Sequence, residues 1–112
     1  MAGKFEIKKT DAGKLMFNLK SGNGQVILTS QQYESMDGVT NGIESVRSNS
    51  QLLERFDRKD ARDGSPYFSL LAGNGQIIGK SEMYSAETGR DNGIESVKTN
   101  APEATVVDTT ES

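Results

Sequence analysis

The first residues in this chain that could do chemistry lie in two identical glycine-rich stretches, GNGQ at 22–25 and GNGQ at 73–76. Glycine-rich loops bind phosphate where they lead into a helix N-terminus, because the backbone N–H groups there point at the anion. Both stretches lead instead into residues typical of a strand, and Asn-Gly tolerates the positive φ angles of a tight hairpin. We therefore predict hairpin turns and no phosphate site at four residues: Asn23, Gly24, Asn74 and Gly75.

The side chains most used in catalysis are scarce. The sequence has neither cysteine nor histidine, which excludes disulfides, thiolate metal sites and the commonest general base. Asp60 and Asp63 lack the regularly spaced oxygen ligands of a calcium loop. Glu44 and Glu95 recur in similar surroundings, whereas an acid and base pair needs two unlike ones. We therefore expect no catalytic residues, no metal and no cofactor, and a protein that is not an enzyme.

Length and charge narrow the class of protein further. The chain has 112 residues, of which 33% are hydrophobic and 26% charged, and this composition suits a single folded domain over residues 1–112. The net charge of -3 is scattered, so no continuous basic surface is expected and nucleic acid is not a predicted partner. Charges interrupt the first ten residues, and no apolar run is long enough to span a membrane. We predict a cytoplasmic protein with no membrane partner.

The motif NGIESV occurs at 41–46 and again, letter for letter, at 92–97. Aligning residues 3–50 with residues 54–101, an offset of 51, gives 20 identities in 48 positions without a gap. Self-similarity of this kind indicates an internal duplication. We place repeat one at about residues 3–53 and repeat two at about residues 54–108, and expect residues 109–112 to be a frayed tail.

Each copy predicts the same order of elements. Residues 4–9 and 14–20 alternate apolar and polar side chains, and a third strand is predicted at 25–30, so each copy begins as a three-stranded antiparallel meander. The period then changes to that of a helix, predicted at 36–48 with an apolar stripe. That stripe consists of Met36, Val39, Ile43 and Val46. The second copy has Arg90 at the place of Val39 but is otherwise compatible with the same helix.

A glycine lies inside each predicted helix and requires an explanation, because it lowers helix stability by about 1 kcal/mol relative to alanine. One interpretation is that the missing side chain lets the helix approach the sheet closely, and the other is that a ligand contacts the bare backbone. The neighbouring asparagines bring no charge, so we favour a structural role. That role is assigned to Asn41, Gly42, Asn92 and Gly93.

With FNLKSGNGQVI and NGIESVR in the first copy and FSLLAGNGQII and NGIESVK in the second, the chain resembles the YegP-like family of small uncharacterised bacterial proteins. The resemblance covers about residues 4–108. It implies an α+β fold in which two tandem β-β-β-α-β repeats form one antiparallel sheet, with helices on one face and the C-terminal strands exchanged between repeats. The chain would then be a monomer that is a pseudo-dimer of its repeats. The family has no established activity, so no catalytic residue is transferred.

Two surfaces are candidates for function. If the helices cover one sheet face, the strand period sends a small apolar set to the open face: Met16, Tyr67 and Leu71. Our main hypothesis is a small binding or accessory module that contacts an unknown protein partner through that face. The alternative is a small-molecule binder or enzyme that uses the cleft between the repeats. There, Asn41 with Asn92, or Tyr33 with Tyr84, would supply polar contacts.

Overall fold

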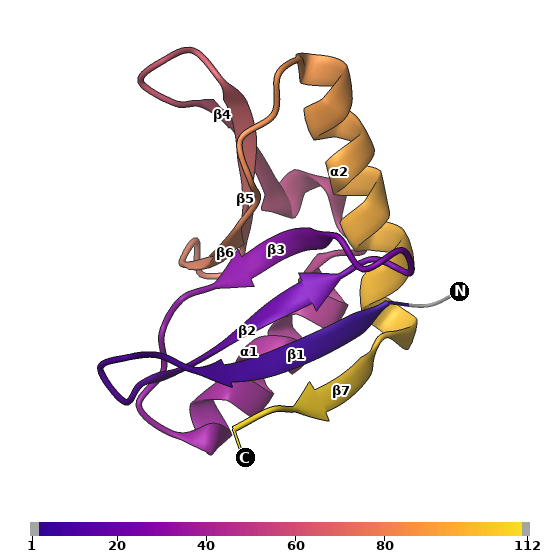
Figure 1. Cartoon of the computed structure of the whole chain (residues 1–112). Coiled ribbons are helices and arrows are strands. Elements are labelled where there is room, and N and C mark those ends of the chain that lie inside the picture. The colour runs from indigo at the N-terminus through magenta and orange to yellow at the C-terminus, as the bar shows by residue number, and fades with distance from the viewer. Residues whose placement is uncertain (1–2, 111–112) are drawn as a thin grey trace.

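The structure is a computed structural model that describes residues 3–110. Each copy of the repeat forms three strands and then a helix, and a seventh strand follows the second helix (Figure 1). In chain order the elements are β1 (Lys4–Lys9), β2 (Leu15–Lys20), β3 (Val26–Ser30), α1 (Met36–Asn49), β4 (Phe56–Asp60), β5 (Pro66–Leu71), β6 (Ile77–Lys80), α2 (Glu87–Asn100) and β7 (Thr105–Asp108). Two short 3₁₀ turns, Leu53–Arg55 and Ala101–Glu103, follow the helices.

All seven strands belong to one sheet in the order β4-β5-β6-β3-β2-β1-β7. The predicted α+β fold and the two meanders are confirmed, and the meanders join through the antiparallel pair β3 and β6. The sheet is not wholly antiparallel, because β7 runs parallel to β1. Strand exchange therefore has one direction: β7 of repeat two pairs with β1 of repeat one, whereas the chain after α1 continues directly into β4.

The two copies meet at an approximate two-fold axis between β3 and β6. Thr29 pairs with Lys80, its own counterpart at the offset of 51, so the axis passes between these two residues. The next position breaks the symmetry, because Leu28 is fully buried while its counterpart is Gly79. A Cβ on Gly79 would lie 2.8 Å from the backbone oxygen of Thr29 and 3.1 Å from Cγ of Leu28. One leucine fills the centre, and a second would not fit there.

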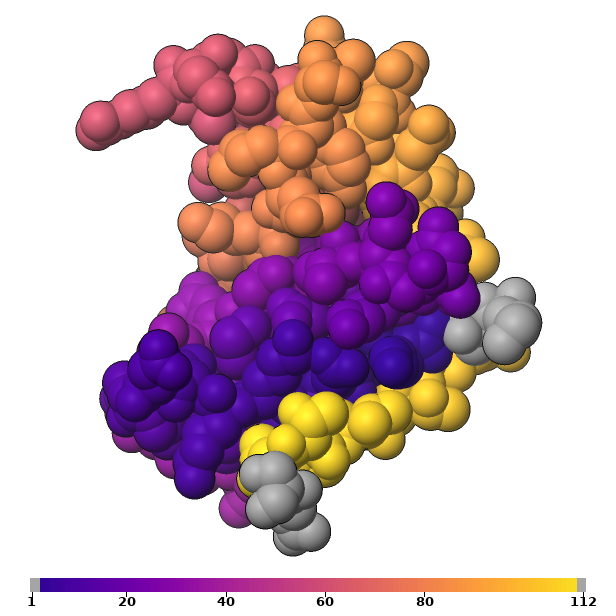
Figure 2. Space-filling model, in the orientation of Figure 1, coloured from indigo at the N-terminus to yellow at the C-terminus, as the bar shows by residue number. Residues whose placement is uncertain are grey.

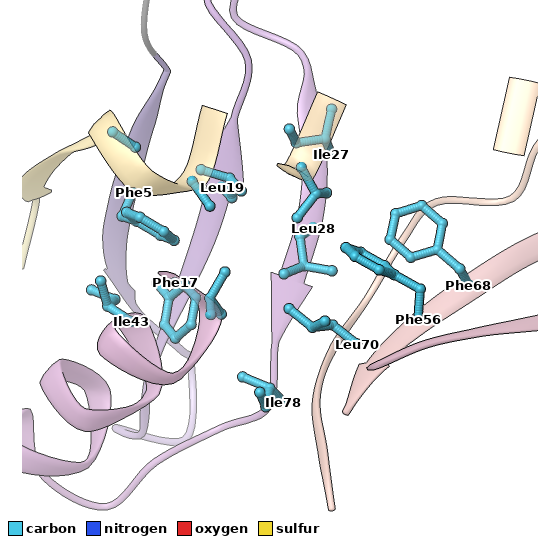
Figure 3. Packing of buried hydrophobic residues seen from close by; sticks show 14 of the residues in the cluster. Phe5, Phe17, Leu19, Ile27, Leu28, Ile43, Phe56, Phe68, Leu70 and Ile78 are labelled. Carbon is cyan, nitrogen blue, oxygen red and sulfur yellow. The ribbon is translucent and has the colours of Figure 1, made fainter. Parts of the chain in front are cut away.

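Both helices pack on the same sheet face, and the core lies between them and the sheet. α1 contacts β2, β5 and β6, and α2 contacts β3 and β5, so each helix reaches strands of both copies. Leu28 and Leu70 lie between the aromatic residues of the two repeats (Figure 3). The core is therefore continuous across the repeat boundary, as the buried residues show: Phe5, Phe17, Leu19, Leu28, Phe56, Phe68 and Leu70.

The apolar stripe of α1 is shorter than predicted, since Val39, Ile43 and Val46 are buried but Met36 is exposed at the first turn. α2 has the same length as α1 although Arg90 replaces the valine. Arg90 is itself buried, and its guanidinium donates to the backbone oxygen of Lys59 at 3.3 Å. In α2, a buried arginine with a hydrogen-bond partner thus occupies the position that an apolar residue has in α1.

Hairpin turns confirm the interpretation of the glycine-rich stretches, with one refinement. Within these two turns the positive φ belongs to Gly24 and Gly75, at 87° and 86°, and not to the preceding asparagines. In each turn the asparagine Oδ1 instead accepts the backbone N–H two residues on. At the C-terminal end, the Thr109 hydroxyl and N–H both donate to the Ile7 oxygen. Residues 111 and 112 of the predicted tail lie outside the described part.

Candidate functional site

Each helix glycine of the NGIESV motif makes room for a tyrosine. A Cβ on Gly42 would lie 2.5 Å from the Tyr33 hydroxyl oxygen, and one on Gly93 would lie 2.2 Å from the Tyr84 hydroxyl oxygen. On its other side the Tyr84 ring stacks on Phe68, with ring centres 6.4 Å apart. The glycines therefore make room for a tyrosine ring rather than for a direct approach of the helix to the sheet, and the nearest sheet atoms are the Cε2 atoms of Phe17 and Phe68, 3.1 and 3.2 Å from the places of the two Cβ atoms.

The duplicated motifs of opposite copies face each other. The β2–β3 turn, residues 21–25 of repeat one, crosses in front of α2 of repeat two (Figure 1), and the two segments enclose a cleft. Figure 2 shows the violet atoms of this turn beside the orange and yellow atoms of α2. We call this the α2 cleft. It joins a GNGQ turn to an NGIESV helix across the repeat boundary.

The α2 cleft has a volume of about 690 Å³. None of the described side chains that line it carries a formal charge, and most can hydrogen-bond. Burial raises the pKa of the Tyr84 hydroxyl, so this group remains a neutral donor and acceptor. The side chains with polar atoms in the cleft include Asn23, Gln25, Tyr84, Asn92, Ser96 and Asn100. Such a lining can bind an uncharged or weakly hydrated polar group.

Some polar groups of the cleft already have partners within the chain. The Asn100 Nδ2 donates to the backbone oxygen of Ser96 at 2.8 Å, which fixes the amide at the end of α2. The Asn23 Oδ1 accepts the backbone N–H of Gln25 at 3.2 Å. No described residue hydrogen-bonds the Asn92 side chain, which is exposed beside Gly93. The Asn92 amide is thus available to a ligand.

A second, smaller cleft lies where the two-fold axis requires it. Turn residues of repeat two meet α1 of repeat one and enclose about 220 Å³, and we call this the α1 cleft. Arg55 does not line this cleft, but its Nη1 donates to the Asn49 Oδ1 at 2.9 Å. The same nitrogen lies 2.8 Å from the place of a Cβ on Gly73. Arg55 therefore contacts Asn49 and Gly73, whose counterparts Asn100 and Gly22 line the α2 cleft.

The predicted inter-repeat contacts are divided between the two clefts. Tyr33 lines the α1 cleft and Tyr84 the α2 cleft, so the tyrosines do not share a site. Asn92 lines the α2 cleft, but Asn41 lines neither cleft. Of the repeat signature, the residues Asn23, Asn92 and Gly93 line the α2 cleft, whereas Gly24, Gly42, Asn74 and Gly75 do not.

Sequence reasoning missed several lining residues. Ser21, Ser96, Thr99 and Asn100 were not among the predicted site residues. The available signal was that Ser96 and Asn100 recur as Ser45 and Asn49 at the offset of 51.

The proposed partner surface on the open sheet face is dispersed. Met16 on β2 and Tyr67 on β5 are counterparts at the offset of 51, and β3 and β6 lie between their strands. Leu71 lies on the same strand as Tyr67, beyond the buried Ser69. All three side chains are partly buried. Their role as a partner surface stays a prediction.

The open face is otherwise polar and carries a cluster of ion pairs around Glu6. Lys20, Lys8 and Lys4 have Nζ atoms 3.2, 3.3 and 3.7 Å from the Glu6 carboxylate. The hydrogen bond from Lys20 is the largest influence that holds the pKa of the Glu6 carboxyl below its usual value. With three lysines to one carboxylate, this part of the face is positive.

Within residues 3–110 neither a metal-binding cluster nor a membrane-spanning helix is present. No group of three or more acidic side chains is arranged to hold a metal ion. None of the helices in this range is long and apolar enough to cross a membrane.

Comparison with known proteins places the chain in a family. The profile described as a domain of unknown function, DUF1508, matches residues 11–57 and again residues 61–108. The chain belongs to the DUF1508 family. Among its relatives, the UPF0339 protein YegP of Escherichia coli K12 is 49% identical over 110 residues, which is 98% of this chain and 100% of YegP. A UPF0339 protein of Shewanella oneidensis is 47% identical over 110 residues, 98% of this chain and 100% of that protein.

Solved structures of DUF1508 proteins have the same fold. The solution NMR structure of E. coli YegP, a protein described as of unknown function, matches with a TM-score of 0.94 at 49% identity, and the match covers 100% of this chain and 97% of the chain in that structure. The NMR structure of the Shewanella oneidensis UPF0339 protein matches with a TM-score of 0.92 at 47% identity and covers 98% of this chain and 93% of the other. The YegP-like resemblance is confirmed, and the relatives are bacterial.

Proposed function

We propose that this DUF1508 protein is a small, non-enzymatic binding module whose ligand occupies the α2 cleft. The observation that carries the proposal is a cleft of about 690 Å³ with neutral hydrogen-bonding side chains and no lining charge. Ligand sites are concave and hold a small number of fixed polar groups, and the helix and hairpin supply both here. The lining contains no pair of ionisable groups in unlike environments, so it favours binding over acid and base chemistry.

A fragment screen tests the proposal directly. Small neutral polar compounds would be added to ¹⁵N-labelled protein, and a ligand is expected to shift the backbone amides of Asn92 and Ser96 in a saturable way. Asn92→Leu removes an exposed amide from the lining, and we expect about tenfold weaker binding from one lost hydrogen bond and the added bulk. Asn41→Leu is the matched control on α1, outside both clefts, and should bind as tightly as wild type.

The open sheet face is the second candidate, because lysines around Glu6 make it positive in a chain of net charge -3. A ligand or protein whose binding survives Asn92→Leu but is lost in the combined Met16→Ser and Tyr67→Ser variant would move the site to that face. A screen in which no compound shifts either region would overturn the binding proposal.

A further inference from the structure

The end of α1 indicates what the α2 cleft can bind. There the guanidinium of Arg55 lies against Gly73 and donates to the Asn49 Oδ1 at 2.9 Å. A guanidinium presents donors in a rigid fork and is weakly hydrated, so neutral oxygen acceptors can hold it without a counter-charge. Asn49 is also the last residue of α1, where the negative end of the helix dipole favours a cation.

The same groups recur in the α2 cleft without an arginine of the chain. Asn100 ends α2 as Asn49 ends α1, and Asn100 and Gly22 line the cleft as counterparts of Asn49 and Gly73. Arg55 lies at the boundary between the two copies, so the offset of 51 gives it one counterpart before it in the chain and one after it. One is Lys4, whose Nζ lies 3.7 Å from Glu6, and the other is Val106 on the edge strand β7. Neither lines the α2 cleft.

We propose that the ligand of the α2 cleft presents a guanidinium group, which would contact the end of α2 as Arg55 contacts the end of α1. This inference rests on the proposed binding function and names its ligand class. The other lining groups suit such a ligand, since the Tyr84, Thr99 and Gln25 side chains offer acceptor oxygens and none of the described lining side chains is cationic. The group could belong to free arginine or to an arginine side chain of a peptide.

The test titrates intact ¹⁵N-labelled protein with methylguanidinium chloride at constant ionic strength, with methylammonium chloride as the matched cation that lacks the fork. We expect saturable shifts at the amides of Ser96, Thr99 and Asn100, and about tenfold weaker binding of methylammonium. Free L-arginine and the peptide acetyl-Gly-Arg-Gly-amide separate the two sources. A tighter peptide indicates a protein segment, and equal or weaker binding of the peptide indicates the free molecule.

Arg55→Ala provides the decisive variant, because it frees the Asn49 oxygen and the space beside Gly73 at the end of α1. A second set of methylguanidinium shifts is then expected at Ser45 and Asn49. Arg55→Ser, which also removes both the charge and the fork, serves the same purpose should the alanine variant not fold. If methylguanidinium shifts no α2-cleft amide, or if neither Arg55 variant gains a second site, the inference is overturned.

The outcomes also separate this inference from the binding proposal. Fragments that shift Asn92 while methylguanidinium shifts nothing would refute the guanidinium ligand and leave the α2 cleft as a binding site. If neither the fragments nor methylguanidinium shift any amide of the α2 cleft, both the binding proposal and the guanidinium ligand are refuted.

Discussion

The α1 cleft and the α2 cleft are built from duplicated residues, yet only the end of α1 is contacted by an arginine among residues 3–110. Each cleft brings the turn of one copy against the helix of the other, with a tyrosine over a helix glycine. Arg55 contacts Asn49 and Gly73, and neither described counterpart of Arg55 lines the α2 cleft. Duplication therefore produced two equivalent places, of which one remains open to a ligand.

Other differences between the copies occur where the approximate two-fold axis gives them unlike surroundings. Leu28 and Gly79 differ because both face the centre, which holds one leucine. Val39 and Arg90 differ where the Arg90 guanidinium reaches the Lys59 backbone oxygen on β4, an edge strand, whereas β1 is covered by β7. Residues stay identical where the local contact is the same in both copies. The comparison thus separates residues whose type is set by contacts within one repeat from residues whose type is set by contacts that differ between the repeats.

The largest loss of stability is expected for Gly79→Leu, which would place a leucine on both sides of the symmetry axis between β3 and β6. The new side chain would meet the backbone oxygen of Thr29 at 2.8 Å and the Leu28 side chain. Overpacking of this kind costs about 1–3 kcal/mol, and a backbone clash places the variant at about 3 kcal/mol. Urea unfolding followed by circular dichroism measures the loss.

The exchange variant sharpens this result. Combining Gly79→Leu with Leu28→Gly moves the single leucine to the other side of the axis and should recover part of the lost stability. An unchanged unfolding midpoint for Gly79→Leu alone would show that the centre has room for two leucines.

A loss of about 2 kcal/mol is expected for Gly93→Ala, and a slightly smaller one for Gly42→Ala. Each added Cβ meets a tyrosine hydroxyl oxygen, at 2.2 Å and 2.5 Å respectively, and this overpacking exceeds the roughly 1 kcal/mol that alanine contributes to a helix. Urea unfolding of both variants gives the comparison. Adding Tyr84→Phe to Gly93→Ala should restore part of the stability, and greater stability of Gly93→Ala than of wild type would contradict the close contact.

Arg90→Val makes α2 resemble α1 and should change stability by less than about 1 kcal/mol, because replacing a buried ion pair by a well-packed apolar residue is often neutral. Its ion-pair partners Asp60, Glu87 and Asp91 are exposed, so their charges return to water. Thermal unfolding at low and high salt measures the change. Arg90→Ala is the control, and it should be less stable than Arg90→Val since it leaves a cavity. A loss above about 3 kcal/mol in Arg90→Val would show that the arginine is essential to α2.

The sequence predicted those parts of the structure that repeat locally. Alternation and the 51-residue offset were sufficient for the meanders, both helices and the buried faces, because these patterns lie within one copy. The α2 cleft could not be predicted in full, because Gln25 and Ser96 come from different copies and meet only through the sheet order. Met16 and Tyr67 are dispersed for a related reason: the symmetry axis reverses β5 relative to β2.

The smallest expected change in stability concerns two acidic residues at opposite ends of the open sheet face. Glu6 is held by three lysines, whereas its counterpart Asp57 pairs with Lys59 at 3.6 Å. Because the pKa of Glu6 is lowered in the folded state, its contribution to stability is present above the unfolded pKa of about 4.3 and is lost as the pH falls through the folded pKa.

Glu6→Gln should therefore cost at most about 1 kcal/mol at pH 7 and progressively less as the pH falls through the folded pKa, and Asp57→Asn should cost less at pH 7. Urea unfolding at a series of pH values measures the difference. If the loss of stability in Glu6→Gln stays the same at every pH, the glutamate acts through packing rather than through its charge, and the lysines around it would be held by the sheet alone.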